Sequence, residues 1–324
     1  MVTEITSDLE NAITVTLKGF YIMTDLRQRR MDLRELIAVG AHFGHQTSRW
    51  CPKMDRYIWG HKNNVHLIDV SKTAQELERA AKFLETAAAQ GKTILFVGTK
   101  KAAQEAIKSV AERVNMPHVT HRWVGGTLSN YSQVKKSVTK LLHFEDVIGR
   151  AAKFPHYTKK EFNTFSKLVE RLKKSVGGIR HLSWPLGAVV VVDVLKEKSA
   201  IKEATAMGIP VVALVDTNGD PSNVNYVIPA NDDAPRVIKL LVDYLGDAVL
   251  AGKEQAAQVK AEKAEKVEKA EAAQSGPARH GVNAAEKAHV EASNTELKDT
   301  DAELKKAKRP MAKASPENGA PKKD

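Results

Sequence analysis

The sequence lacks the features that mark several common classes of protein. It has one cysteine, Cys51, which excludes an internal disulfide framework and fits a reducing cytosol. It has no run of about 18 apolar residues, so we expect no membrane-spanning helix. Its first residues, Met1 to Met23, lack the basic start and compact apolar stretch of a signal peptide. A secreted or membrane protein is therefore not expected.

Motifs for catalysis and for cofactor or metal binding are also missing. There is no Walker loop, no G-x-G-x-x-G after a strand, no G-x-S-x-G and no C-x-x-C. The histidines around Cys51 (His42, His45, His61 and His66) are too loosely spaced to indicate a metal site. We therefore predict no catalytic residues, no cofactor and no metal.

Basic residues, by contrast, are abundant. Fifty Lys and Arg stand against 39 Asp and Glu, which gives a net charge of +11. From Gly252 onward there are 15 basic and 13 acidic residues, so the part before it has 35 and 26, a net charge of +9. Such a surplus favours a polyanionic partner, which is RNA, DNA or an anionic membrane surface.

The composition divides the chain into three parts. Residues 1–30 form an extension, and because Met23 and Met31 are alternative starts, they need not be translated. Residues 31–250 alternate apolar and amphipathic stretches, as a folded domain does. Residues 251–324 are rich in Lys, Ala and Glu and poor in large apolar residues, so we predict a disordered tail. Within the tail, KAEKAEKVEKAEAA has the composition of a transient, solvated helix.

The domain shows strands that alternate with helices. Strands are predicted at 65–68, 93–97, 188–194, 211–215 and 226–228, and helices at 73–89, 100–112, 199–207 and 232–250. The β-branched run at 188–194 is typical of a strand buried on both faces. This alternation predicts an α/β fold with a doubly wound, flavodoxin-like parallel sheet flanked by helices.

Residues 131–176 interrupt this alternation. Apolar residues recur there at steps of three and four, with Glu145 in one of the expected apolar places: Val134, Val138, Leu141 and Ile148, and then Phe162, Phe165, Val169, Leu172 and Val176. The segment has 11 basic and 4 acidic residues. We predict an inserted, projecting antiparallel helical hairpin, a coiled coil that contacts RNA or protein.

Two segments have the residue types of an RNA interface. Residues 27–62 hold eight basic and three acidic residues with Trp50, Tyr57 and Trp59 among them. In His121–Asn130 (HRWVGGTLSN), Arg122 offers a fork for phosphate and Trp123 a stacking surface. The alternative is that the tryptophans belong to the core and that the glycines form a tight turn. This alternative and RNA contact can both be true.

A third segment leaves an enzyme open as an alternative. Gly98-Thr99-Lys100-Lys101 follows a strand and begins a helix, where an anion can bind. Asp193 and Asp216 come at the carboxyl ends of strands, where doubly wound folds place ligands. These residues would suit an enzyme for a phosphorylated small molecule, but the glycine pattern of such enzymes is missing.

Several motifs together resemble a known family. AHFGHQTSRWCPKMDRYIWGHKNNVHLIDVSKT, ILFVGTKKAA, HRWVGGTLSN, the KKE of residues 159–161, the GGI of residues 177–179 and IKEATAMGIPVVALVDTNGDPSNVNYVIPANDDA occur in the order found in the bacterial small-subunit ribosomal protein S-two family. The resemblance covers about Met31 to Leu250. One departure is His181–Gly187 (HLSWPLG), where the family has a stretch like Met-Leu-Pro-Asp.

The resemblance implies a structural protein of the small ribosomal subunit, cytoplasmic and ribosome-bound. Its partners would be small-subunit rRNA and neighbouring small-subunit proteins, including the large mRNA-binding protein S-one, and neither membrane nor DNA. By motif, the residues expected to face RNA are Arg49, Trp50, Lys53, Lys62, Lys100, Arg122 and Trp123. The charge of the hairpin adds Lys135, Lys136, Lys173 and Lys174. A free RNA-binding factor remains a second alternative.

Overall fold

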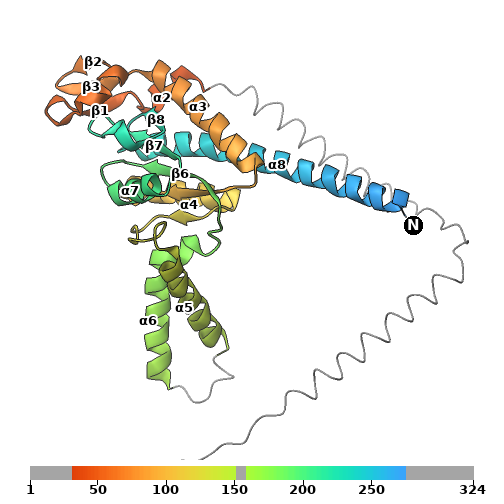
Figure 1. Ribbon diagram of the computed structural model, residues 1–324. Coiled ribbons are helices and arrows are strands. Elements are labelled where there is room, and N and C mark those ends of the chain that lie inside the picture. The colour runs from red at the N-terminus through yellow and green to blue at the C-terminus, as the bar shows by residue number, and fades with distance from the viewer. Residues whose placement is uncertain (1–30, 151–157, 275–324) are drawn as a thin grey trace, which may run out of the picture. The chain divides into compact units, whose positions relative to one another are not determined.

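The computed structural model describes residues 31–150 and 158–274 (Figure 1). The chain divides into two units, Met1–Lys263 and Ala264–Asp324, and both β-sheets belong to the first unit. The predictions for residues 1–30, for the turn at 151–157 and for residues 275–324 lie outside the described residues. In the part that is described, no helix is long and apolar enough to cross a bilayer.

A parallel sheet of five strands forms the centre of the first unit. In spatial order the strands are β5 (His118–Val119), β4 (Thr93–Val97), β6 (Leu186–Val192), β7 (Val211–Val215) and β8 (Tyr226–Pro229). Numbered along the chain from β4, this order is 2-1-3-4-5, that of flavodoxin-like folds, which confirms the predicted α/β class. β6 ends before Asp193 and not at Val194, because Asp193 has a φ of 71° that no strand residue adopts.

The sheet is apolar on both faces because successive side chains of a strand point in opposite directions. Ile94 and Phe96 of β4 pack into one cluster, whereas Leu95 and Val97 pack into the other. The first cluster is covered by α2 (Leu33–Val39), α3 (Val70–Ala89), α4 (Lys101–Val114) and α8 (Pro235–Gln274). The second is covered by α5 (Tyr131–Gly149), α7 (Lys198–Ala206) and the end of α6 (Lys159–Val176). This arrangement accounts for the continuous β-branched run in β6, all of whose residues are buried.

Among these helices, α3, α4 and α7 begin and end near the predicted residues, whereas α2 was not predicted. The prediction that the last helix ends at Leu250 is wrong, because the Ala, Lys and Glu residues that follow are good helix formers. That helix begins at Pro235, whose fixed φ suits a first turn.

A second, antiparallel sheet of three strands was not predicted. Its strands are β1 (Phe43–Gln46), β2 (Ile58–Lys62) and β3 (Val65–Ile68), in the order β1-β3-β2, with short 3-10 helices at Thr47–Arg49 (η1) and Pro52–Tyr57 (η2). The alternation of strands and helices had suggested that the strand at 65–68 belongs to the parallel sheet. That prediction is wrong, because β3 lies in the antiparallel sheet. Asn63 and Asn64, with φ of 51° and 60°, join β2 to β3 in a two-residue turn that favours antiparallel pairing.

Two long helices occupy the segment for which a hairpin is predicted, α5 (Tyr131–Gly149) and α6 (Lys159–Val176). They pack against each other (Figure 1). The rings of Phe144 and Phe165 lie 5.2 Å apart. Val134, Val138 and Leu141 are buried as their spacing predicts, but further along Val147 is buried in place of Ile148. A 3-10 helix, η4 (Gly177–Ile179), then leads from α6 toward the sheet.

Candidate functional site

The first group of candidate residues lies on and beside the antiparallel sheet. Arg49 ends η1 and Lys62 ends β2, and both side chains are exposed. Trp50 is 38% exposed, whereas Lys53 forms an ion pair of 3.0 Å with Asp220. Thus Arg49, Trp50 and Lys62 are free to meet a partner, and Lys53 is engaged within the protein.

The same sheet carries an exposed indole that is not among the residues predicted by motif. Trp59 in β2 is 74% exposed, the largest exposed fraction among the exposed large apolar side chains of the described part. It lies three residues before Lys62 in β2, so this strand carries both an exposed aromatic ring and an exposed cation. Unpaired bases stack on such faces.

The glycine-rich segment between β5 and α5 is organised by a residue far along the chain, Glu203 of α7. The Glu203 carboxylate accepts hydrogen bonds from the Trp123 indole N–H (2.9 Å) and from the backbone N–H groups of Gly126 (2.9 Å), Leu128 (3.0 Å) and Ser129 (3.3 Å). Burial alone would raise the pKa of Glu203, but these hydrogen bonds hold it below its ordinary value. The segment is thus a fixed loop.

This geometry separates the two candidate residues of the loop. Trp123 is 8% exposed and packs in the second core cluster, which leaves little ring surface for stacking on a base. Arg122, its neighbour, is exposed and forms no ion pair with the described residues. Gly126 has a φ of +85°, so the loop conformation requires glycine there. Hence Trp123 has a structural role, and Arg122 remains a candidate for phosphate contact.

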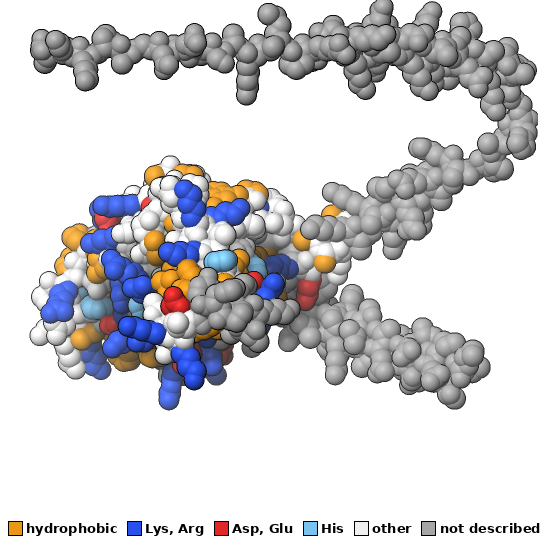
Figure 2. Space-filling view, turned by 90° about the horizontal axis from the view of Figure 1, so that it is seen from below, with side chains coloured by type: hydrophobic (Ala, Val, Ile, Leu, Met, Phe, Trp, Pro, Cys, Tyr) orange, Lys and Arg blue, Asp and Glu red, His pale blue; other side chains and the backbone are white. Residues whose placement is uncertain are grey.

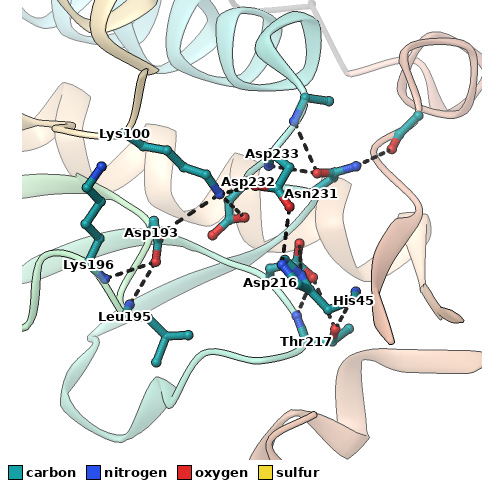
Figure 3. A network of polar contacts seen from close by, with 12 residues as sticks. His45, Lys100, Asp193, Leu195, Lys196, Asp216, Thr217, Asn231, Asp232 and Asp233 are labelled. Carbon is teal, nitrogen blue, oxygen red and sulfur yellow. Dashed lines mark hydrogen bonds and ion pairs between the residues drawn. The ribbon is translucent and has the colours of Figure 1, made fainter. Parts of the chain in front are cut away.

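Lys100 lies at the carboxyl edge of the parallel sheet, at the switch point between β4 and β6 (Figure 3). Its ammonium group is 2.7 Å from Asp232, 2.5 Å from Asp233 and 3.7 Å from Asp193. Burial lowers the pKa of Lys100, but its hydrogen bonds to Asp232 and Asp233 outweigh that effect and raise it. Lys100 therefore neutralises internal carboxylates, and the structure does not turn it toward a partner as the resemblance implied.

The acidic partners of Lys100 respond to the same environment. Burial raises the pKa of Asp232 to about 6, and the neighbouring Asp216 and Asp193 add to the effect, although Lys100 opposes it. The more exposed Asp233 has a lowered pKa, because its hydrogen bond to Lys100 outweighs burial. The switch point thus holds Lys100 within a cluster of aspartates, and the excess of carboxylates helps to keep the pKa of Asp232 high.

The anion position at the start of α4 is also occupied from within. The backbone N–H of Thr99 donates a hydrogen bond of 2.9 Å to the buried carboxylate of Glu197. Burial raises the pKa of Glu197 in spite of this bond. A phosphate at this helix N-terminus would have to displace Glu197, which argues against the alternative of an enzyme for a phosphorylated small molecule.

The carboxyl edge also contains residues that could hold a metal ion. His45 of β1 lies 2.9 Å from Asp216 and 3.2 Å from Asp233. Its hydrogen bond to Asp216 raises the pKa of His45 above the ordinary value, although burial acts against this. Ligand atoms of His45, Asp232 and Asp233 lie within 4.8 Å of one another, and an imidazole with carboxylates is a donor set that a divalent cation accepts. No local pattern in the sequence indicates this grouping, because these residues come from distant segments.

The four candidate lysines of α5 and α6 are all exposed. Lys135, Lys136 and Lys173 form no ion pair with described residues, whereas Lys174 pairs with Glu170 at 2.9 Å. The seam between the helices is apolar, so the charged side chains occupy the outer surface of both helices. These positions leave the lysines available to a polyanion.

Fold and site together define a basic α/β protein whose ligand edge is closed by its own side chains and whose unpaired cations lie on the surface. Comparison with known proteins supplies the family. The model of the family described as Ribosomal protein S2 matches residues 36–252, about two thirds of the chain. The chain belongs to this family, a class of small-subunit ribosomal proteins that are structural and not enzymes.

Two relatives show how close the likeness is, and both carry the name small ribosomal subunit protein uS2. The protein of Micrococcus luteus is 47% identical over 227 residues, which cover 68% of this chain and 78% of the relative. The protein of Saccharophagus degradans is 43% identical over 229 residues, which cover 71% of this chain and 93% of the relative. The resemblance inferred from the sequence motifs is thereby confirmed.

Proposed function

We propose that this protein binds small-subunit rRNA as a structural constituent of the small ribosomal subunit and supports subunit assembly and translation. The observation that carries the proposal is a set of exposed cations without acidic partners among the described residues: Arg49, Lys62, Arg122, Lys135, Lys136 and Lys173. Phosphates are the partners that such cations favour, since each contact releases counterions. Trp50 and Trp59 add aromatic surface for unpaired bases.

The helices α5 and α6 form a projecting coiled-coil strut in this proposal. Their apolar residues are used in packing against each other and against the sheet, while their cations face outward. Neighbouring small-subunit proteins, among them the large mRNA-binding one, are the protein partners we infer. The protein would accordingly act in the cytoplasm, bound to ribosomes. No step of this function needs a cofactor.

Sedimentation of a tagged copy through a sucrose gradient tests the proposal. We expect stoichiometric protein in the small-subunit peak at low salt and again after a moderately high-salt wash. Protein at the top of the gradient in both salts would contradict it. Release by the salt wash alone would favour a free RNA-binding factor.

A charge-reversal variant tests the role of the two helices. Replacing Lys135, Lys136, Lys173 and Lys174 by Glu should reduce incorporation into the small-subunit peak. The matched control reverses four exposed cations of α7 and α8 that form no ion pair with the described residues: Lys198, Lys202, Arg236 and Lys239. Equal incorporation of the two variants would show that α5 and α6 do not contact RNA through these lysines.

A further inference from the structure

A hollow of about 690 Å³ opens at the amino edge of the parallel sheet, the edge opposite to that of Lys100. It lies where α8 passes three connections: the turn from α3 into β4, the turn from α4 into β5, and the loop before β6. Its polar lining consists of Lys92, Thr93, Asn115, His181, Ser183 and Lys253, and we call it the amino-edge hollow. Its size is that of a ligand pocket, for which about 300–1,000 Å³ is usual.

The wall that α8 contributes is held close to the ends of α3 and α4. A side chain at Gly252 would collide with the carbonyl oxygen of Glu85, so α8 and α3 touch there (Figure 1). Lys253, the next residue, donates hydrogen bonds to the carbonyl oxygens of Val114 (2.6 Å) and Asn115 (3.1 Å) at the end of α4. The hollow is therefore bounded by backbone that packing and hydrogen bonds fix in place.

Lys253 brings a cation that lacks an acidic partner. It forms no ion pair with the described residues, and burial lowers its pKa. An ammonium group has three N–H donors, and the carbonyl oxygens at the end of α4 take two of them. The third is available to an acceptor in the hollow that Lys253 lines.

The opposite wall adds a second cation and a hydroxyl donor. Lys92 is half-buried and forms no ion pair with the described residues. Its stem packs on the start of β6, where a Cβ at Gly187 would lie 2.8 Å from the Cβ of Lys92. The hydroxyl oxygens of Thr93 and Ser183 lie 2.7 Å apart, so one donates to the other. That pair keeps one O–H that can donate to a ligand.

The charges of the hollow favour a ligand with a single negative charge. No Asp or Glu lines it, whereas Lys92 and Lys253 do. The carboxyl ends of α3 and α4 meet there as well, and each brings about half a negative charge. The balance is about one positive charge. A carboxylate supplies the matching charge and accepts hydrogen bonds from both ammonium groups.

The apolar part of the lining indicates what carries that charge. Met116, Pro117 and Ala256 lie in the hollow, where they can pack on the side chains of a peptide. A sugar–phosphate strand has no apolar side chains to place against them. On the face that Figure 2 shows, Lys and Arg are more prominent than Asp and Glu, so positive charge by itself does not distinguish the hollow. The combination of cations with apolar surface does.

An exposed indole follows directly on the lining of the hollow. Trp184, the residue after Ser183, is 43% exposed. Trp is among the residues that most often dominate the binding energy of protein interfaces. His181–Gly187 is also the stretch in which this sequence departs from the family motif. The residues around the hollow thus have the composition of a protein-binding surface.

We propose that the amino-edge hollow binds an acidic peptide segment of a partner protein. Lys92 and Lys253 hold a carboxylate of the segment, and Met116 and Trp184 contact its apolar side chains. The inference goes beyond the proposed function, because it concerns a protein partner at the sheet edge and is tested without ribosomes.

The test is a fluorescence anisotropy titration of the full-length protein with a dye-labelled peptide, Ala-Leu-Glu-Leu-Ala, blocked at both ends. The matched peptide has Gln in place of Glu. We expect Lys92→Gln to weaken binding of the Glu peptide roughly tenfold, the effect of losing one hydrogen bond to a charged group. Lys239→Gln removes the same charge from an exposed position of α8 and should change nothing. Trp184→Ala should weaken both peptides to a similar degree.

Every other result counts against the proposal. Equal binding of the Glu and Gln peptides would show that no carboxylate is recognised. Equal effects of Lys92→Gln and Lys239→Gln would show only diffuse attraction to a basic surface. Displacement of the peptide by a uridine oligonucleotide or by inorganic phosphate would assign the hollow to RNA or to a small anion. If the Glu peptide does not bind the wild-type protein at all, the inference fails and the proposed function is untouched.

Carbodiimide coupling locates the bound carboxylate. The reagent activates the Glu side chain of the peptide, and a neighbouring lysine amine displaces it as a urea and forms an amide bond. Mass spectrometry should find the peptide on Lys92 or Lys253 and much less of it on Lys239. Labelling of Lys92 and Lys239 to the same extent, or of neither lysine of the hollow, contradicts the proposal.

Discussion

Replacing Glu203 by alanine should destabilise the protein by an amount that the geometry allows us to estimate. The substitution leaves the Trp123 indole N–H and the backbone N–H groups of Gly126 and Leu128 without their acceptor. Each unsatisfied buried donor costs about 1–3 kcal/mol, and the partial exposure of this site favours about 1 kcal/mol for each. For the three donors together we therefore expect a loss of about 3 kcal/mol. For a domain of this size that lowers the unfolding midpoint by about 6–12 °C.

Thermal unfolding followed by circular dichroism measures this loss. Glu203→Gln keeps one acceptor oxygen and should fall between the wild-type protein and the alanine variant, while Glu105→Ala, an exposed change in α4, should have little effect. Because the folded pKa of Glu203 is lowered, its contribution is present above the unfolded pKa of about 4.3. It disappears as the pH falls through the folded pKa. A shift of under about 1 °C for Glu203→Ala would refute the assigned role.

Three further predictions concern the sheet edge and α6. The folded pKa of Asp232 is raised to about 6, so the free energy of unfolding should fall by roughly 2–3 kcal/mol as the pH rises from about 4 to about 6. Denaturant titrations across this pH range measure the fall, and Asp232→Asn should abolish it. Lys100→Ala leaves Asp232, Asp233 and Asp193 without their cation, so it should lower the free energy of unfolding in urea at pH 7 by about 2–4 kcal/mol. An unchanged free energy of unfolding would show that solvent already screens the cluster. Thr158→Ala removes the capping box at the start of α6 and should cost about 1 kcal/mol locally. Hydrogen exchange of the first α6 amides should then be several-fold faster, and unchanged exchange would mean that packing alone holds this turn.

The regular part of the fold could be predicted because its burial pattern is visible along the chain. The run that forms β6 lies between two core clusters, so every position is apolar and the strand stands out. The steps of three and four in α5 and α6 likewise follow from a shared apolar seam. In both cases neighbouring residues experience the same environment, which is the condition under which a local pattern reports structure.

The antiparallel sheet could not be recognised in this way. β1 and β2 are short and mostly half-buried or exposed, so neither shows a clear alternation of apolar and polar residues. The available signal was the pair Asn63 and Asn64, whose side chains tolerate the positive φ that a two-residue hairpin turn requires. That signal marks a turn, but it does not tell which strand of a larger fold the hairpin joins.

Site residues were hardest to predict where their partners lie far away in sequence. Glu203 accepts hydrogen bonds from residues 74 to 80 positions earlier, and nothing near it in the chain indicates this. Lys100 looks like a surface cation until Asp193, Asp232 and Asp233 are brought to it by the ends of different strands. Only the general rule that carboxyl ends of parallel strands meet at one edge anticipates part of this convergence.

The antiparallel sheet explains why a doubly wound fold here serves a structural role. The backbone N–H of His45 donates to the Thr217 hydroxyl (2.9 Å), and that of Cys51 donates to the Thr217 carbonyl (2.8 Å), which fixes this sheet against the loop that follows β7. A side chain at Gly44 would collide with Thr217, so the contact is close. The edge where related folds bind ligands is thus covered by the protein's own sheet, and its cation Lys100 is engaged by Asp232 and Asp233. Charge that is left to attract a partner must lie elsewhere, and the exposed cations Arg49, Lys62 and Arg122, which form no ion pair with the described residues, meet that condition.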